Sequence, residues 1–189
     1  MKDNTGKREN NMEFQNLIEK RRTVRKYAEG NTVTKEDILT MIKAAQEAPS
    51  WKNSQTGRYY CIMDEKDVNQ FREECLPEMN AGKCENAVLI ISTFVHNRAG
   101  FQKDGTADNE LGNGWGCYDL GLQNENLILK AEELGYGTLI MGIRDADKIR
   151  EMCSIPETET VVAVIALGVP REQPNRPKRK ETEDIVKFL

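Results

Sequence analysis

The sequence predicts an α+β fold in which helices cover the faces of a sheet of about four strands. Helical and strand-like patterns alternate along the 189 residues, without a strict repeat, a G-x-G-x-x-G fingerprint or a P-loop. Residues 87–95 and 160–169 read as strands that are buried on both faces, which indicates the middle of a sheet. The length suits one domain, which we expect over residues 12–189.

The N-terminal residues 1–11 are polar and mixed in charge, so we expect a frayed or disordered start rather than a secretory signal. A helix is predicted over residues 12–22, because Phe14, Leu17 and Ile18 fall on one stripe.

The second helix follows Thr34, a good N-cap residue with acidic side chains just after it. Its apolar face is predicted to end at Pro49, because the residue before a proline resists the α region. Residues 48–57 then form a polar loop, and residues 58–63 a short strand.

In the middle of the chain, Asp64 can cap a helix that extends to Leu76, and the central strand 87–95 follows. Residues 97–116 are rich in Gly, Asp and Asn. Long connections of this kind in a compact domain are typical of lids or binding loops.

The strongest helical periodicity covers residues 115–134 and ends at Gly135, a typical C′ residue. A strand over 138–143 and a short helix from Asp145 to Cys153 precede the last strand. Residues 170–180 are basic and rich in proline, and a short helix or tail ends the chain.

The charge balance argues against some partners. A formal net charge of −4 and a pI near 5.3 disfavour non-specific binding to DNA or to anionic membranes. The longest apolar stretches have the length of strands and are too short to span a bilayer. We therefore expect a cytoplasmic protein with no nucleic-acid or membrane partner.

Metal and thiol chemistry are disfavoured. The five cysteines are scattered without a CxxC pair, and His96 is the only histidine, so neither a disulfide framework nor a metal site is expected. His96 follows a strand, where a structural or loop role is the better interpretation.

Four stretches carry polar groups that suit a phosphorylated heterocycle. The basic segment 21–27 offers guanidinium groups and a hydroxyl for a phosphate, although in isolation a solvated helix end is the better explanation. The loop 48–55 carries Asn and Gln side chains that can hydrogen-bond a ring edge. Glycines flank the strand near 138–142, and residues 176–180 form a second cationic cluster, whose alternative is a solvated tail.

In this order, the stretches RRTVRKY, APSWKNSQ, LGYGTLIMG and ALGVPREQPNRPKRK resemble the nitroreductase family of FMN-dependent oxidoreductases over residues 16–180. The resemblance implies a central, mostly antiparallel sheet flanked by helices, and an intertwined homodimer with FMN at two interface sites. It also implies that the loop carrying Asn53 comes from the partner subunit, so that each site is composite.

Carried over by position, the resemblance implies a set of cofactor-binding residues and assigns no catalytic residue and no metal ligand. The phosphate and ribityl contacts are Arg21, Arg22, Thr23 and Arg25, and the loop at the ring supplies Pro49, Ser50, Trp51, Asn53 and Gln55. The strand beside the ring supplies Leu139, Ile140, Met141 and Gly142, and the second phosphate contact is made by Lys178 and Lys180. Arg179 is the alternative phosphate contact if the alignment with the family shifts by one residue. Thr56 replaces the usual proline of the loop, and Ile143 and Arg144 follow Gly142 where a glutamate or glycine is common.

The implied activity is ping-pong hydride transfer from NADH or NADPH through FMN to a small electron-poor acceptor such as a nitroaromatic, a quinone or a flavin. Two alternatives stay open. The same scaffold can support flavin destruction, reductive dehalogenation or azoline oxidation, or the chain can be a non-enzymatic flavin-binding module.

Overall fold

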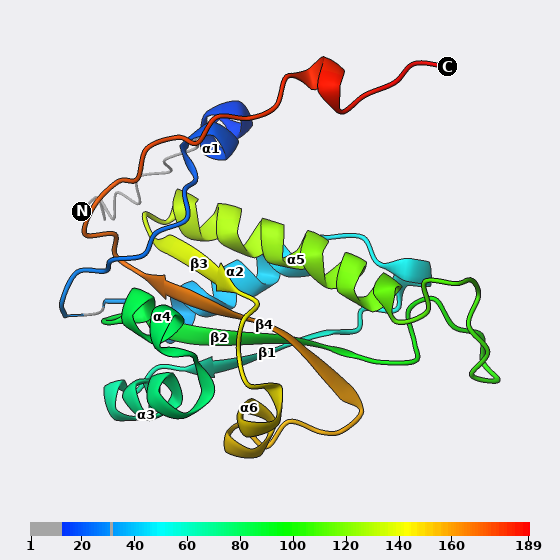
Figure 1. Cartoon of the computed structure of the whole chain (residues 1–189), viewed down its shortest axis with the longest axis horizontal. Helices are drawn as coiled ribbons and strands as arrows, with labels where there is room; N and C mark the ends of the chain where they lie inside the picture. The colour runs from blue at the N-terminus through cyan, green and yellow to red at the C-terminus, as the bar shows by residue number, and fades with distance from the viewer. Residues whose placement is uncertain (1–12, 31) are drawn as a thin grey trace, which may run out of the picture.

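The computed structural model describes residues 13–30 and 32–189 and confirms the α+β class. A four-stranded antiparallel sheet of order β1-β2-β4-β3 lies between two layers of helices (Figure 1). The elements are α1 (Phe14–Lys20), α2 (Lys35–Gln46), β1 (Gly57–Ile62), α3 (Glu65–Cys75), α4 (Glu78–Ala81), β2 (Val88–Val95), α5 (Gly114–Glu133), β3 (Gly137–Met141), α6 (Ala146–Met152) and β4 (Glu159–Gly168). The expectation for residues 1–11 lies outside the described residues.

The two apolar runs form the middle strands, as predicted. β2 and β4 pair along their whole length, and most of their side chains are buried on both faces of the sheet. On one face α2 and α5 pack through Met41, Ile90 and Leu127, and on the other α3 and α6 pack through Phe71 and Ile149. Each such buried side chain stabilises the fold by about 1.5–3 kcal/mol relative to exposure.

The second helix begins with a capping box. The Thr34 hydroxyl accepts a hydrogen bond from the Asp37 N–H, and the Asp37 carboxylate accepts one from the Thr34 N–H. Tyr136, just before β3, donates a further hydrogen bond of 2.9 Å to Asp37. The side-chain hydrogen bond from Thr34 holds the pKa of Asp37 below its usual value, and burial opposes this only in part.

Replacing Asp37→Asn should therefore reduce the free energy of unfolding at pH 7 by about 1 kcal/mol, because charge-assisted hydrogen bonds are lost. A carboxyl with a lowered pKa stabilises the fold above its unfolded pKa of about 3.9, and this stabilisation disappears as the pH falls through the folded pKa. Urea denaturation at pH 7 and pH 3 should show a larger difference between the variant and the wild type at pH 7 than at pH 3. Asp67→Asn is the control, because Asp67 has the same place in the first turn of α3 without a side-chain hydrogen bond.

Two expectations need correction. The predicted apolar stripe of α1 is only partly buried: Leu17 is buried against α5, but Phe14 and Ile18 remain 69% and 37% exposed. The strand predicted over 138–143 ends at Met141, and Ile140 is 45% exposed, because β3 is an edge strand. The four-residue helix α4 was not predicted; it is too short for an apolar period.

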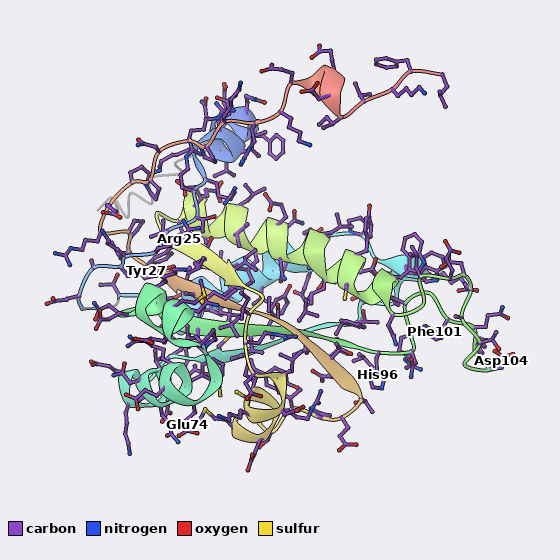
Figure 2. The ribbon with its side chains drawn as sticks, viewed as in Figure 1. Arg25, Tyr27, Glu74, His96, Phe101 and Asp104 are labelled. Carbon is purple, nitrogen blue, oxygen red and sulfur yellow. The ribbon has the colours of Figure 1, made fainter. Side chains whose placement is uncertain are left out.

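The long connection before α5 is an ordered loop rather than an open linker. Its two ends are joined by a pair of hydrogen bonds between Asn97 and Asn113, of 2.7 and 3.0 Å. Between them, Phe101 and Ala107 form an isolated bridge, so that residues 101–107 form a small hairpin whose tip is near Asp104 (Figure 2). Among the described residues no helix is both long and apolar enough to cross a membrane.

Candidate functional site

The basic segment, residues 21–27, lies beside the edge strand β3. Its Val24 N–H donates to the Thr138 carbonyl at 2.9 Å, and Thr23 forms a parallel bridge with Thr138. Figure 2 labels Arg25 and Tyr27 on this segment. Val24 and Tyr27 are buried, and the Tyr27 hydroxyl donates to the Val24 carbonyl at 3.0 Å. These contacts hold the backbone of the basic segment in place against β3.

The arginines of the basic segment keep donors free. The Arg22 Nη1 donates to the Glu19 and Arg21 carbonyls, but its Nε is buried and has no partner in the described chain. The Arg21 side chain forms no hydrogen bond or ion pair with any described residue, and Arg25 has only one long contact of 3.5 Å to the Thr23 carbonyl. Free guanidinium donors next to a fixed backbone suit an oxyanion.

The strand next to the basic segment exposes an apolar edge. Leu139 and Met141 point into the core, whereas Ile140 points to solvent. Beyond them, a Cβ at Gly142 would meet no heavy atom within 4 Å. This arrangement leaves an open, apolar strip of the kind against which a flat ring can pack.

The second cationic cluster is at the same end of the molecule. The C-terminal tail, residues 169–189, runs back along the basic segment and α1 before it projects away from the sheet (Figure 1). The Arg171 N–H donates to the Lys26 carbonyl at 3.0 Å, and Arg176 forms an ion pair of 3.5 Å with Glu19. Lys178, Arg179 and Lys180 follow and are all exposed.

The Asn53 loop, residues 48–56, has a strained backbone. Lys52, Asn53 and Gln55 have φ angles of 47°, 56° and 47°. The left-handed region costs a residue other than glycine about 1–2 kcal/mol, and such strain is concentrated at binding sites. Asn53 and Gln55 are exposed, as a role in ligand binding requires, and their side chains are joined by a hydrogen bond of 3.2 Å.

Contacts from α5 and from the long loop hold the Asn53 loop. The Trp51 N–H donates to the Asp119 carboxylate at 2.8 Å, and the Trp51 and Trp115 rings lie 4.5 Å apart. Lys52 forms an ion pair of 3.0 Å with Asp108 in the long loop. Sequence reasoning missed Asp119; its place four residues after Trp115, one helical turn away, was the available signal.

In one chain the two halves of the candidate site are far apart. The Asn53 loop meets α5 at Asp119, whereas Lys20, just before the basic segment, meets it at Glu132. These positions are thirteen residues apart, or about 20 Å along the helix axis. No hydrogen bond or ion pair in the described chain joins the Asn53 loop to the basic segment or to β3. The sequence-predicted residues therefore form two clusters rather than one.

The surface hollows of one chain agree with this separation. Three hollows of about 570, 390 and 620 Å³ are lined by none of the predicted site residues. The hollow beside Gln55 is only about 130 Å³, which is small for a cofactor pocket. None of these four hollows is both lined by the predicted residues and large enough for a cofactor.

The cysteines do not form a reactive centre. All five are free, and burial raises the pKa of Cys61, Cys75 and Cys84 to about 11, so that these thiols stay protonated at neutral pH. In the part of the chain that the structure describes, no group of three or more His, Cys, Asp or Glu side chains could hold a metal ion.

Comparison with known proteins identifies relatives. A family model described as the nitroreductase family matches residues 18–169. An Archaeoglobus fulgidus protein whose provisional name is NADH dehydrogenase/NAD(P)H nitroreductase is 26% identical, over 83% of this chain and 85% of that protein. A Staphylococcus aureus NADPH-dependent oxidoreductase is also 26% identical, over 85% of this chain but only 66% of its own length.

The fold has close structural counterparts. The crystal structure of a nitroreductase family protein from Streptococcus pneumoniae aligns with a TM-score of 0.80 at 19% identity, covering 93% of this chain and all of that one. At this identity the likeness concerns the fold alone.

Proposed function

This chain belongs to the nitroreductase family, and from this premise we propose that it binds FMN and acts as an NAD(P)H-dependent oxidoreductase on a small electron-poor acceptor. The names of the A. fulgidus and S. aureus relatives support a nicotinamide donor. The observation that carries the proposal is a basic segment held against β3 in which the Arg21 side chain and the Arg22 Nε have no partner among the described residues, next to a strand that exposes Ile140.

The residues present fit FMN when each is considered by its chemistry. The guanidinium groups of the basic segment can hold a phosphate by charge-assisted hydrogen bonds, and Lys178 or Lys180 can add a further charge. Ile140 and the open backbone at Gly142 suit the face of a flat ring system. The side chains of Asn53 and Gln55 offer donors and acceptors for the edge of that ring.

When bound, FMN would supply the redox chemistry that links NADH or NADPH to the acceptor. The chain itself binds and orients. Its cationic side chains would neutralise the phosphate, and Ile140 would pack against one face of the ring.

We propose further that the site is completed by a second copy of the chain. The Asn53 loop is about 20 Å along α5 from the basic segment, so the loop of one protomer would meet the basic segment of its partner. Exposed apolar side chains support such an assembly: Phe14 and Ile18 on α1, and Ile185, Phe188 and Leu189 in the C-terminal tail. Apolar patches of this kind mark interaction surfaces.

The visible spectrum of the purified protein tests cofactor binding directly. We expect flavin absorption bands, FMN released by heat, and NADH or NADPH oxidation that depends on a nitroaromatic or quinone. A yellow protein without such turnover would indicate different chemistry on the same scaffold. A colourless protein whose thermal unfolding does not shift on addition of FMN would overturn the proposal.

Replacing Arg21→Ala should weaken FMN binding by about 10–100-fold, because a hydrogen bond between two charged groups contributes about 1.5–3 kcal/mol. Quenching of flavin fluorescence during titration measures the dissociation constant. Lys66→Ala, which removes one exposed positive charge from α3, is the matched control and should bind FMN as the wild type does. Equal affinity of the Arg21 variant and the wild type would remove Arg21 from the site.

A further inference from the structure

Asp119 is an unusual residue for the middle of a helix. It lies in the second turn of α5 and is only 3% exposed, although carboxylates are almost never fully buried without a partner. Burial raises its pKa, and the hydrogen bond from Trp51 opposes this increase. The one hydrogen bond it accepts, among the described residues, comes from the Trp51 backbone at 2.8 Å.

This hydrogen bond reaches the start of the strained turn. Trp51 is the first residue of the short 3-10 turn 51–53, and the three left-handed residues Lys52, Asn53 and Gln55 follow it immediately. A backbone in such a conformation persists only where its surroundings determine it. Local hydrogen bonds close the turn, from the Asn53 N–H to the Ser50 carbonyl at 2.9 Å and from the Gln55 N–H to the Ser50 hydroxyl at 3.1 Å. They shape the turn but do not attach it to the protein.

Contacts with other elements attach the turn to the protein, among them a hydrogen bond of 2.9 Å from the Arg58 side chain on β1 to the Gln55 carbonyl. The ion pair between Lys52 and Asp108 is largely exposed on the lysine side, and exposed ion pairs contribute little. The Trp51 ring packs on Trp115, which is also on α5. The hydrogen bond to Asp119 is partly buried and joins the backbone itself to the helix, so it restricts the orientation of the turn more strongly than the ion pair does.

We propose that Asp119 is a positioning residue that anchors the Asn53 loop to α5 and thereby sets the direction in which Asn53 and Gln55 present their side chains to the flavin ring. This inference rests on the proposed function as far as the flavin is concerned. The anchoring itself is a property of the free protein and can be measured without any cofactor.

The test uses the two tryptophans of the chain, Trp51 and Trp115, whose contact is a built-in reporter of the loop position. In the flavin-free protein, near-ultraviolet circular dichroism is recorded for Asp119→Leu, Asp119→Ala and Asp119→Asn. Leucine and alanine remove the acceptor, so the tryptophan bands should fall markedly. Asparagine keeps an acceptor oxygen in the same place, so the bands should stay close to those of the wild type.

Titration with FMN is the second readout. The leucine and alanine variants should bind FMN about tenfold more weakly or worse, with recovery in the asparagine variant. Glu132→Gln is the matched control for circular dichroism, because Glu132 is a buried carboxylate on the same helix that lies far from the loop. Its tryptophan bands should not change.

The outcomes separate the two proposals. If the leucine or alanine variant unfolds cooperatively but keeps the tryptophan bands of the wild type, the anchoring role of Asp119 is wrong. If asparagine fails to restore bands that leucine removes, the hydrogen-bond acceptor is not the cause and the inference is also wrong. If the wild type binds no FMN while the bands respond as expected, the proposed function fails and the anchoring stands.

Discussion

A heterodimer that combines an Arg21→Glu chain with an Asn53→Asp chain should regain one FMN site, although neither variant binds FMN as a homodimer. In a composite site, the basic segment of one protomer meets the Asn53 loop of the other. One site of the heterodimer then carries both substitutions and the other carries none. Arg21→Glu repels the phosphate, and Asn53→Asp removes an amide donor while tolerating the left-handed φ of 56°.

The measurement needs two affinity tags, so that only heterodimers are recovered, followed by titration with FMN. We expect half of the wild-type flavin content, at wild-type affinity. The reciprocal pair is the control: a wild-type chain with an Arg21→Glu/Asn53→Asp chain should give two damaged sites. The reverse result, with flavin bound only by the reciprocal pair, would show that each site lies within one chain.

Replacing Gly137→Ala should separate the basic segment from β3. A Cβ at this position would lie 2.4 Å from Val24 Cγ2 and 2.8 Å from Val24 Cβ, distances that side chains do not tolerate. Val24 is buried and anchors the segment by its backbone hydrogen bond to Thr138, so it cannot simply rotate away. We expect the free energy of unfolding to fall by about 1–3 kcal/mol and FMN affinity to fall with it.

Urea denaturation and FMN titration of the same variant measure the two effects. The double variant Gly137→Ala/Val24→Ala removes the nearest clashing atom and should recover part of the loss beyond what the single variants predict when added. Strict additivity of the two substitutions in both measurements would contradict a contact between these residues.

Much of the fold could be predicted because its signals are local. Thr34, Asp64 and Asp145 accept backbone hydrogen bonds at the starts of α2, α3 and α6, as their residue types indicate. Gly135 ends α5 with a φ of 89°. The nitroreductase family, expected from four stretches in order, is confirmed by the match over residues 18–169.

The rest depends on contacts that no local pattern contains. The pattern of α1 correctly predicts an amphipathic helix, yet the Phe14 side chain is largely exposed and the Ile18 side chain partly exposed in one chain. The place of Asp119 one helical turn after Trp115 puts both on one face of α5, but it does not indicate a contact with a loop 68 residues earlier. The predicted site residues fall into two clusters. Their residue types indicate which ligand groups they suit, but not how far apart the two clusters lie in one chain.

The two hydrogen bonds between Asn97 and Asn113 close the long loop at its base. The length of the segment between these residues can therefore change without moving β2 or α5. Doubling a flexible loop costs only about 0.6 kcal/mol in closure entropy. Insertions or deletions at the tip near Asp104 are therefore thermodynamically mild, and the hairpin is open to remodelling by evolution or by grafting.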